Sequence, residues 1–137
     1  MPSVRIGSDH EFLLLVADDS AEGAPQQLAA ELRLDGLSAA VQVCCHYATG
    51  FEDLADFFQR LADEWLGWAG ARTWESLEHE LELEARHEYG HVQLRVTMRR
   101  EGPGWGNLGW SVTGDLTIEP GEQLSAIARD MRVVAFG

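Results

Sequence analysis

Residues 81–98 read LELEARHEYGHVQLRVTM, and this stretch decides the fold. Apolar and polar residues alternate on both sides of positions 89–90, which is typical of two β-strands joined by a tight turn. Antiparallel pairing about this turn gathers the apolar residues on one face. On the other face it sets Glu84 against Arg95, where opposite charges attract. Two independent patterns thus agree on one register, and the stretch is predicted to be a central hairpin.

The tip of this hairpin, residues 87–91, reads HEYGH and matches H-E-x-x-H, the signature of zinc metalloproteases. That chemistry needs a helix, on which both histidines reach one metal. In the hairpin, His87 belongs to the inward residues, whereas His91 lies outward opposite Glu88, so the two rings should diverge. A helix would also place Gly90 in its interior, at a cost of about 1 kcal/mol relative to Ala. We therefore predict a turn here and no metal site.

Alternation indicates further strands. Asp35-Gly36 is a favoured two-residue turn, about which Leu34 pairs with Leu37. The other strand candidates are residues 4–6, 12–16 and 110–118.

Two segments have helical spacing of apolar residues instead. The first begins near residue 51, where Thr49 and Glu52 have the spacing of a capping box, and its apolar stripe runs on to Trp65. The second covers residues 122–136, with acids at its start and arginines later, as the helix dipole favours.

These elements predict an α+β fold in a single domain, residues 1–137. We expect one antiparallel sheet of about five to seven strands with two helices packed on one face, in the order strands, helix, three strands, helix. A chain of 137 residues is long enough to bury one core.

Charge is the strongest signal of composition. The chain has 23 acidic and 10 basic residues, a formal net charge of -13. Nucleic acid is an unfavourable partner for such a surface, because phosphate binding needs clustered Lys and Arg. A basic protein or a cationic ligand would be attracted. The alternative is that the acids chiefly keep the protein in solution.

Location and chemistry are also constrained. No apolar run approaches the roughly 20 residues of a membrane span, and the N-terminus lacks a signal-peptide layout, so we expect a cytoplasmic protein. Cys44 and Cys45 are adjacent, which rules out a disulfide framework, and on a strand they face opposite ways. No P-loop, Rossmann or G-x-S-x-G motif is present, so the sequence indicates no cofactor and no catalytic residue.

Tryptophans form the other cluster. Trp68, Trp74 and Trp105 are candidates for lining a ligand pocket. The alternative is that they fill the end of a small core. Trp65 is expected in the core because it extends the helical stripe.

Residues 67–78, GWAGARTWESLE, and 120–124, PGEQL, resemble the core of a family of small acidic bacterial proteins of unknown function. The resemblance covers most of the chain after about residue 36 and implies no activity, cofactor or catalytic residue. In size and acidity, the chain is also similar to immunity proteins of bacterial toxin systems.

We therefore expect a non-enzymatic interaction protein, of the immunity type or similar, that binds a basic protein. The acids expected to meet that partner are Glu80, Glu82 and Glu84 on the sheet and Asp53, Asp56 and Asp63 on the first helix. The rival hypothesis is a small enzyme or ligand-binding domain with a tryptophan-lined pocket.

Overall fold

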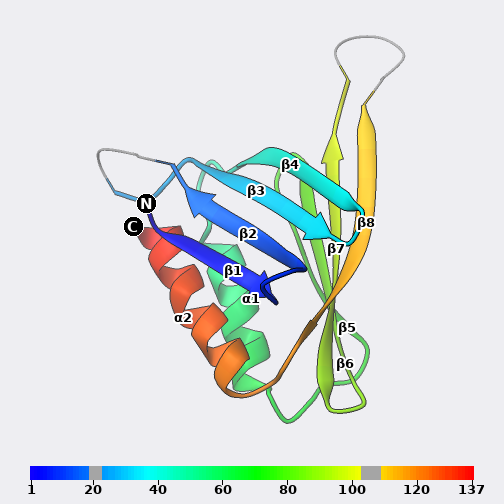
Figure 1. Cartoon of the computed structure of the whole chain (residues 1–137). Helices are drawn as coiled ribbons and strands as arrows, with labels where there is room; N and C mark the ends of the chain where they lie inside the picture. The colour runs from blue at the N-terminus through cyan, green and yellow to red at the C-terminus, as the bar shows by residue number, and fades with distance from the viewer. Residues whose placement is uncertain (19–22, 103–108) are drawn as a thin grey trace.

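The computed structural model describes residues 1–18, 23–102 and 109–137. They form two four-stranded antiparallel sheets and two helices (Figure 1). The first half of the chain contains β1 (Ser3–Gly7), β2 (Phe12–Ala17), β3 (Gln27–Leu34), β4 (Leu37–Cys44) and α1 (Glu52–Asp63). The second half contains β5 (Ala71–Glu75), β6 (Leu81–Glu88), β7 (His91–Arg100), β8 (Trp110–Ile118) and α2 (Glu122–Phe136). Each half is thus a four-stranded meander followed by a helix.

The predicted α+β class and the antiparallel pairing are confirmed, but the single sheet of five to seven strands is wrong. The strand orders are β1-β2-β3-β4 and β5-β6-β7-β8, and β4 forms no ladder with a strand of the second sheet. The prediction also missed β5, so four strands rather than three separate the helices. In β5, Arg72 shares the inward side with Trp74, and this charged residue conceals the alternation.

Both predicted hairpin registers are confirmed. Glu84 lies opposite Arg95 in the β6–β7 pair, and the turn between these strands has positive φ angles of 55° at Tyr89 and 78° at Gly90. In the β3–β4 pair, Leu34 lies opposite Leu37. Such tight turns match the twist of the strands that they join.

The first helix is shorter than its apolar stripe suggested. It ends at Asp63, so Trp65 falls beyond it and is 51% exposed, and its predicted place in the core is wrong. The capping box is wrong as well, because no side chain caps α1 and the Glu52 N–H donates to the Thr49 carbonyl instead.

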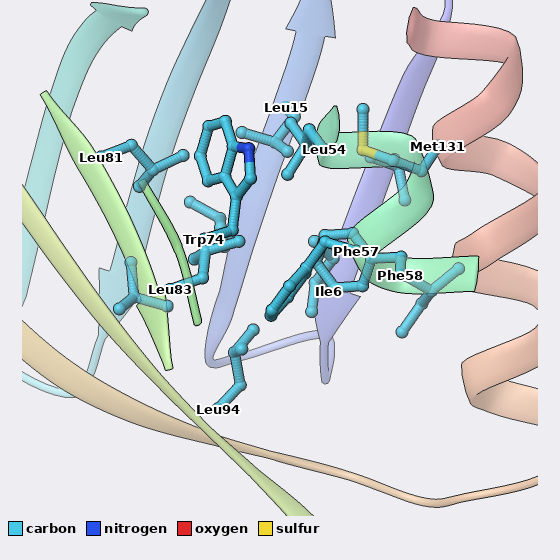
Figure 2. Close-up of a cluster of buried hydrophobic side chains, with 14 of the residues drawn as sticks. Ile6, Leu15, Leu54, Phe57, Phe58, Trp74, Leu81, Leu83, Leu94 and Met131 are labelled. Atoms are coloured by element: carbon cyan, nitrogen blue, oxygen red, sulfur yellow. The ribbon is translucent and has the colours of Figure 1, made fainter. Parts of the chain in front are cut away.

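One hydrophobic core unites the two sheets and the helices. Figure 2 shows Leu83 and Leu94 of the second sheet directed toward Ile6 of the first sheet and Phe58 of α1. The helices pack against each other, α2 also contacts β1 and β2, and α1 contacts β5. The helices therefore share one core with both sheets instead of lying on one face of a single sheet.

The two sheets come into contact where β8 passes β3. Gly114 lies against Leu34 so closely that a Cβ on the glycine would overlap the leucine Cδ1. Neither helix in the described ranges is long and apolar enough to cross a membrane.

Candidate functional site

A groove of about 680 Å³ lies between the outer face of the first sheet and one end of the second. Its residues come from β2, β3 and β4 on one side and from the β5–β6 turn, the end of β7 and the start of β8 on the other. They are Leu14, Val16, Ala29, Ala30, Glu31, Ala40, Val41, Gln42, Glu78, His79, Glu80, Arg99, Arg100, Glu101 and Trp110. In Figure 1, β7 and β8 continue past β4 beside this part of the first sheet.

The floor of the groove is mainly apolar because most of the side chains that β2, β3 and β4 direct toward it are apolar. Strand pairing aligns Val16 with Ala29, and Leu14 with the Glu31–Ala40 pair of the next two strands. Ala29 and Ala40 are exposed and small, so the sheet surface is hollow between them and the second sheet. The result is a mainly apolar depression, with Glu31 between Leu14 and Ala40, in a strongly acidic protein.

Charged groups border this floor, and several of them are already paired. Glu31 bonds Arg33 at 2.9 Å, and Arg99 bonds Glu82 at 2.8 Å. Four further charged residues that line the groove, Glu78, Glu80, Glu101 and Arg100, form no ion pair with any residue that the structure describes. Three acids against one arginine leave the charge that has no ion-pair partner acidic by two units.

The three sheet acids predicted to meet a partner have different surroundings. Glu80 lines the groove, but its carboxylate accepts hydrogen bonds from the Ser76 hydroxyl at 2.8 Å and the Cys44 N–H at 3.2 Å. Glu82 is bonded to Arg99, and Glu84 is bonded to Arg86 at 2.9 Å. Neighbouring arginines thus balance the charge of the outer face of the second sheet.

The three helix acids lie on α1, and none of them lines the groove. Asp53 accepts a hydrogen bond from the Leu54 N–H, and Asp63 accepts one from the Gln59 side chain. Asp56 is exposed. Of the six predicted acids, the structure places Glu80 alone at the groove.

The tryptophans predicted to line a pocket are not gathered at this groove. Trp74 is buried in the core at 9% exposure, as Figure 2 shows, and its Nε1–H has no hydrogen-bond partner among the described residues. Trp68 donates from Nε1 to the Ala85 carbonyl at 3.2 Å and meets the His87 ring edge to face. Trp105 lies outside the described residues.

Trp110, which the sequence placed at the start of a strand and not among the pocket candidates, lines the groove and is 36% exposed. It begins β8 opposite Arg100, two positions before the partly buried Val112 on the same side of the strand. The inward side of β8 meets the core at Leu116 and Ile118, whereas at Trp110 it borders the groove. The alternation of apolar and polar residues along β8 could not show that one end of this side faces the core and the other end faces the groove.

The HEYGH turn directs its histidines apart, as predicted. His87 Nε2 lies 3.1 Å from the Trp65 carbonyl oxygen, whereas His91 Nδ1 lies 3.1 Å from the Glu119 carboxylate. The two rings therefore contact different parts of the chain and share no metal position.

In the described part of the chain, the residues best placed to hold a metal ion are Glu75, His79 and Glu82, whose ligand atoms lie within 4.8 Å of one another. Arg99 donates to both Glu82 oxygens, at 2.8 and 3.0 Å, and these bonds hold the pKa of Glu82 below its usual value. His79 contacts the Glu75 carboxylate from the β5–β6 turn, where its φ is 64°. A cation here would have to displace Arg99, and we interpret the cluster as an ion-pair network.

The thiol of Cys44 is poorly suited to nucleophilic chemistry. Burial, and then the neighbouring Glu80 carboxylate, raise its pKa, which disfavours the reactive thiolate. The thiol borders a smaller cavity of about 240 Å³ together with His46. The His46 Nδ1 already accepts a hydrogen bond from the Ala48 N–H, so this nitrogen is engaged in its own turn.

Comparison with protein families matches residues 5–135 to a family of unknown function, DUF6228. No curated protein and no solved structure matches the chain. The match extends toward the N-terminus beyond the stretch after residue 36 that the sequence motifs suggested.

Proposed function

The chain belongs to this family of unknown function, and from its surface we propose a non-enzymatic interaction protein that binds a basic protein partner in the groove. The observation that carries the proposal is an apolar floor bordered by Glu78 and Glu101, two acids without ion-pair partners among the described residues. Apolar side chains of the partner would fill the floor, and its Lys or Arg side chains would meet these acids.

The size and lining of the groove support binding. A volume of about 680 Å³ lies within the range of about 300–1,000 Å³ that is common for binding sites. The apolar floor can contribute affinity through buried area, whereas charges contribute mainly to the rate and specificity of association. A net charge of -13 would attract a basic partner over distances longer than a contact.

The chemistry of the described side chains favours binding over catalysis. A nucleophile needs a lowered pKa or an adjacent base, and the Cys44 thiol has a raised pKa. The HEYGH histidines point to different partners. Binding alone is therefore the simpler function for this surface.

An immunity-type role is one form of this function, in which an acidic protein neutralises a basic toxin domain by covering it. The outer acids Asp53, Asp56 and Asp63 of α1 would add to the attraction without forming the contact itself. The free thiols Cys44 and Cys45 suit a reducing compartment such as the cytoplasm.

The proposal is tested with a probe peptide, acetyl-(Lys-Val)4-amide, labelled with a fluorophore, and with (Glu-Val)4 as the charge control. We expect fluorescence anisotropy to report binding of the Lys peptide that weakens as salt is added, and much weaker binding of the Glu peptide. Equal binding of both peptides would contradict a basic partner.

Variants then locate the binding. Ala29→Trp fills the floor, and we expect it to weaken binding by about tenfold or more, equivalent to about 1.4 kcal/mol. Thr117→Trp, on the outer face of the second sheet, is its matched control. The double reversal Glu78→Lys with Glu101→Lys is matched by Glu52→Lys with Glu122→Lys. The proposal is wrong if the groove variants bind the Lys peptide as tightly as their controls do.

A further inference from the structure

We propose that the partner segment binds as an added β-strand, paired with the free edge of β4 and facing the end of β7. This inference rests on the proposed function and specifies how the groove holds its partner. Three features of the structure support it: the direction of the β4 backbone groups, the composition of that edge and the walls of the groove.

The hairpin between β3 and β4 determines which backbone groups of β4 are free. A two-residue turn makes Leu34 and Leu37 a hydrogen-bonded pair, after which bonded and non-bonded pairs alternate. Ser38, Ala40 and Gln42 belong to the non-bonded pairs, so their N–H and C=O groups point away from β3. β4 is the last strand of its sheet and contacts β7 without forming a ladder with it, so these groups are not used in pairing with a described strand.

Cys44 provides an independent check of this alternation. It lies two positions after Gln42, and its N–H donates to the Glu80 carboxylate at 3.2 Å, on the side away from β3. The next N–H, that of Cys45, donates back to the Gln26 carbonyl at 3.0 Å. The backbone therefore alternates between the two sides as the turn requires.

The edge of β4 also lacks the features that usually prevent strand pairing. Edge strands are normally blunted by charged residues, proline, bulges or short length. Leu37–Cys44 reads LSAAVQVC, eight residues with no charge and no proline, and it pairs with β3 without a bulge. In contrast, the edge strands β5 and β8 carry charged residues. A strand that is long, uncharged and open is a template for another strand.

The groove provides room on the other side of this edge. Its walls include three consecutive residues of β4, at positions 40–42, and residues 99–101, of which Arg99 and Arg100 end β7 and Glu101 follows it. The β6–β7 ladder extends no further than Met98, and Arg99 then donates its N–H to the Glu80 carbonyl. An extended segment laid along β4 would therefore have the end of β7 as its opposite wall.

The charges of the groove select the occupant. A second copy of this chain would bring another net charge of -13 against the first, which disfavours pairing of two β4 edges. A basic segment is attracted instead, and its side chains alternate in direction along a strand. One set can pack against Ala40 and Trp110 while the other reaches Glu78 and Glu101 with lysine or arginine. We therefore assign the edge to an extended segment that alternates basic and apolar residues.

Amide hydrogen exchange measured by NMR tests the pairing directly. In the free protein, the Ala40 and Gln42 amides should exchange faster than those of Ala39 and Val41, which bond to β3. When acetyl-(Lys-Val)4-amide saturates the protein, we expect exchange at Ala40 and Gln42 to slow by tenfold or more. The Ser38 amide has the same direction but does not line the groove, and it should change least.

Peptide chemistry provides the second arm. N-methylation of alternate residues removes the donors of one peptide edge, and one of the two possible methylation patterns should abolish binding while the other is tolerated. Ala40→Pro removes a free-edge donor without removing a bond to β3, and Ser38→Pro is its matched control. We expect tenfold weaker binding for Ala40→Pro and a change within twofold for Ser38→Pro. The methylated peptides test the pairing on the unaltered protein if Ala40→Pro does not fold.

Each outcome decides between the two proposals. Peptide binding that depends on the groove, without slower exchange at Ala40 and Gln42 and with both methylation patterns tolerated, would overturn the added strand and leave the proposed function standing. Failure of the peptide to bind in the groove would overturn both. If the Ala40 and Gln42 amides exchange more slowly as the protein concentration is raised without peptide, and sedimentation shows a dimer, the edge binds a second copy. That result would overturn the inference.

Discussion

Glu80 and Cys44 join the two sheets: the carboxylate, just before β6, accepts a hydrogen bond from the backbone N–H at the end of β4 at 3.2 Å. The other carboxylate oxygen accepts from the Ser76 hydroxyl at 2.8 Å, and the Ser76 oxygen in turn accepts from the Leu81 N–H at 3.1 Å. Ser76 is 3% exposed. An acid that the sequence suggested for partner binding thus lines the groove and also holds the two sheets together.

We predict that Glu80→Ala destabilises the fold by about 1–3 kcal/mol, because it leaves the Cys44 N–H and the buried Ser76 hydroxyl without their acceptor. Glu84→Ala is the matched control, since Glu84 bonds the exposed Arg86 and such surface pairs contribute about 0–1 kcal/mol. Urea unfolding followed by circular dichroism gives both values. Equal losses would contradict the structural role of Glu80.

The same contact predicts the reactivity of Cys44. Burial comes first and Glu80 second among the causes that raise the pKa of this thiol. Glu80→Gln removes the second cause and keeps the first, so the thiolate fraction at a given pH should rise. In a Cys45→Ser background, we expect iodoacetamide to alkylate Cys44 faster in the Glu80→Gln variant. An unchanged rate, with the fold intact, would contradict the electrostatic role of Glu80.

Local pairing was predictable from the sequence, whereas the division into two sheets was not. Alternation in residues 81–98 and the Asp35-Gly36 turn gave registers that the structure confirms. Alternation identifies the apolar face of a strand, but it does not say which strand lies beside an edge. The edge at β4 and the short β5 therefore went unrecognised. In β5, Arg72 lies on the inward side because its guanidinium donates to the Glu64 carboxylate at 3.2 Å. No pattern in the neighbouring sequence predicts that Glu64 is its partner.

The groove was beyond sequence reasoning for a related reason. Ala29 and Ala40 are ordinary small residues on an outward face, and Trp110 comes from the other half of the chain. They form a surface only once the two sheets are placed against each other. The composition shows that the chain is rich in acids. It does not show that Arg99 pairs with Glu82 or that Arg86 pairs with Glu84, because these pairs depend on contacts in the folded chain.

Close packing between the sheets gives a third prediction. A methyl group on Gly114 would overlap Leu34 Cδ1, so Gly114→Ala must push that side chain aside. We expect a loss of about 1–2 kcal/mol, within the range for overpacked sites. Leu34→Ala in the same chain should relieve the overlap, so that the double variant loses less than the sum of the two single variants. Additive losses in thermal or urea unfolding would contradict the contact.

The Glu82–Arg99 ion pair makes the stability of the fold depend on pH in the acid range. Hydrogen bonding to Arg99 is the first cause that lowers the pKa of Glu82, so the folded carboxylate stays charged below the usual glutamate value of about 4.3. The contribution of the pair is complete above that value and is lost as the pH falls through the folded-state pKa. The stability difference between wild type and Glu82→Gln should therefore shrink on acidification. Urea unfolding across an acid titration measures it, and a difference that stays constant or grows would contradict the pairing.

The diverging histidines of the HEYGH turn lead to a last prediction. His87 lies against Trp68 and within hydrogen-bond distance of the Trp65 carbonyl, whereas 46% of the His91 side chain is exposed beside Glu119. We expect His87→Ala to lower the unfolding free energy by about 1 kcal/mol or more, because it removes a packed ring and a hydrogen bond. His91→Ala should change it by less than about 0.5 kcal/mol, as is usual for surface substitutions. Addition of zinc should leave the melting temperatures of wild type and both variants unchanged. A zinc-dependent rise in wild type that disappears in both variants would instead mean that the two rings converge on a metal, which this hairpin geometry does not allow.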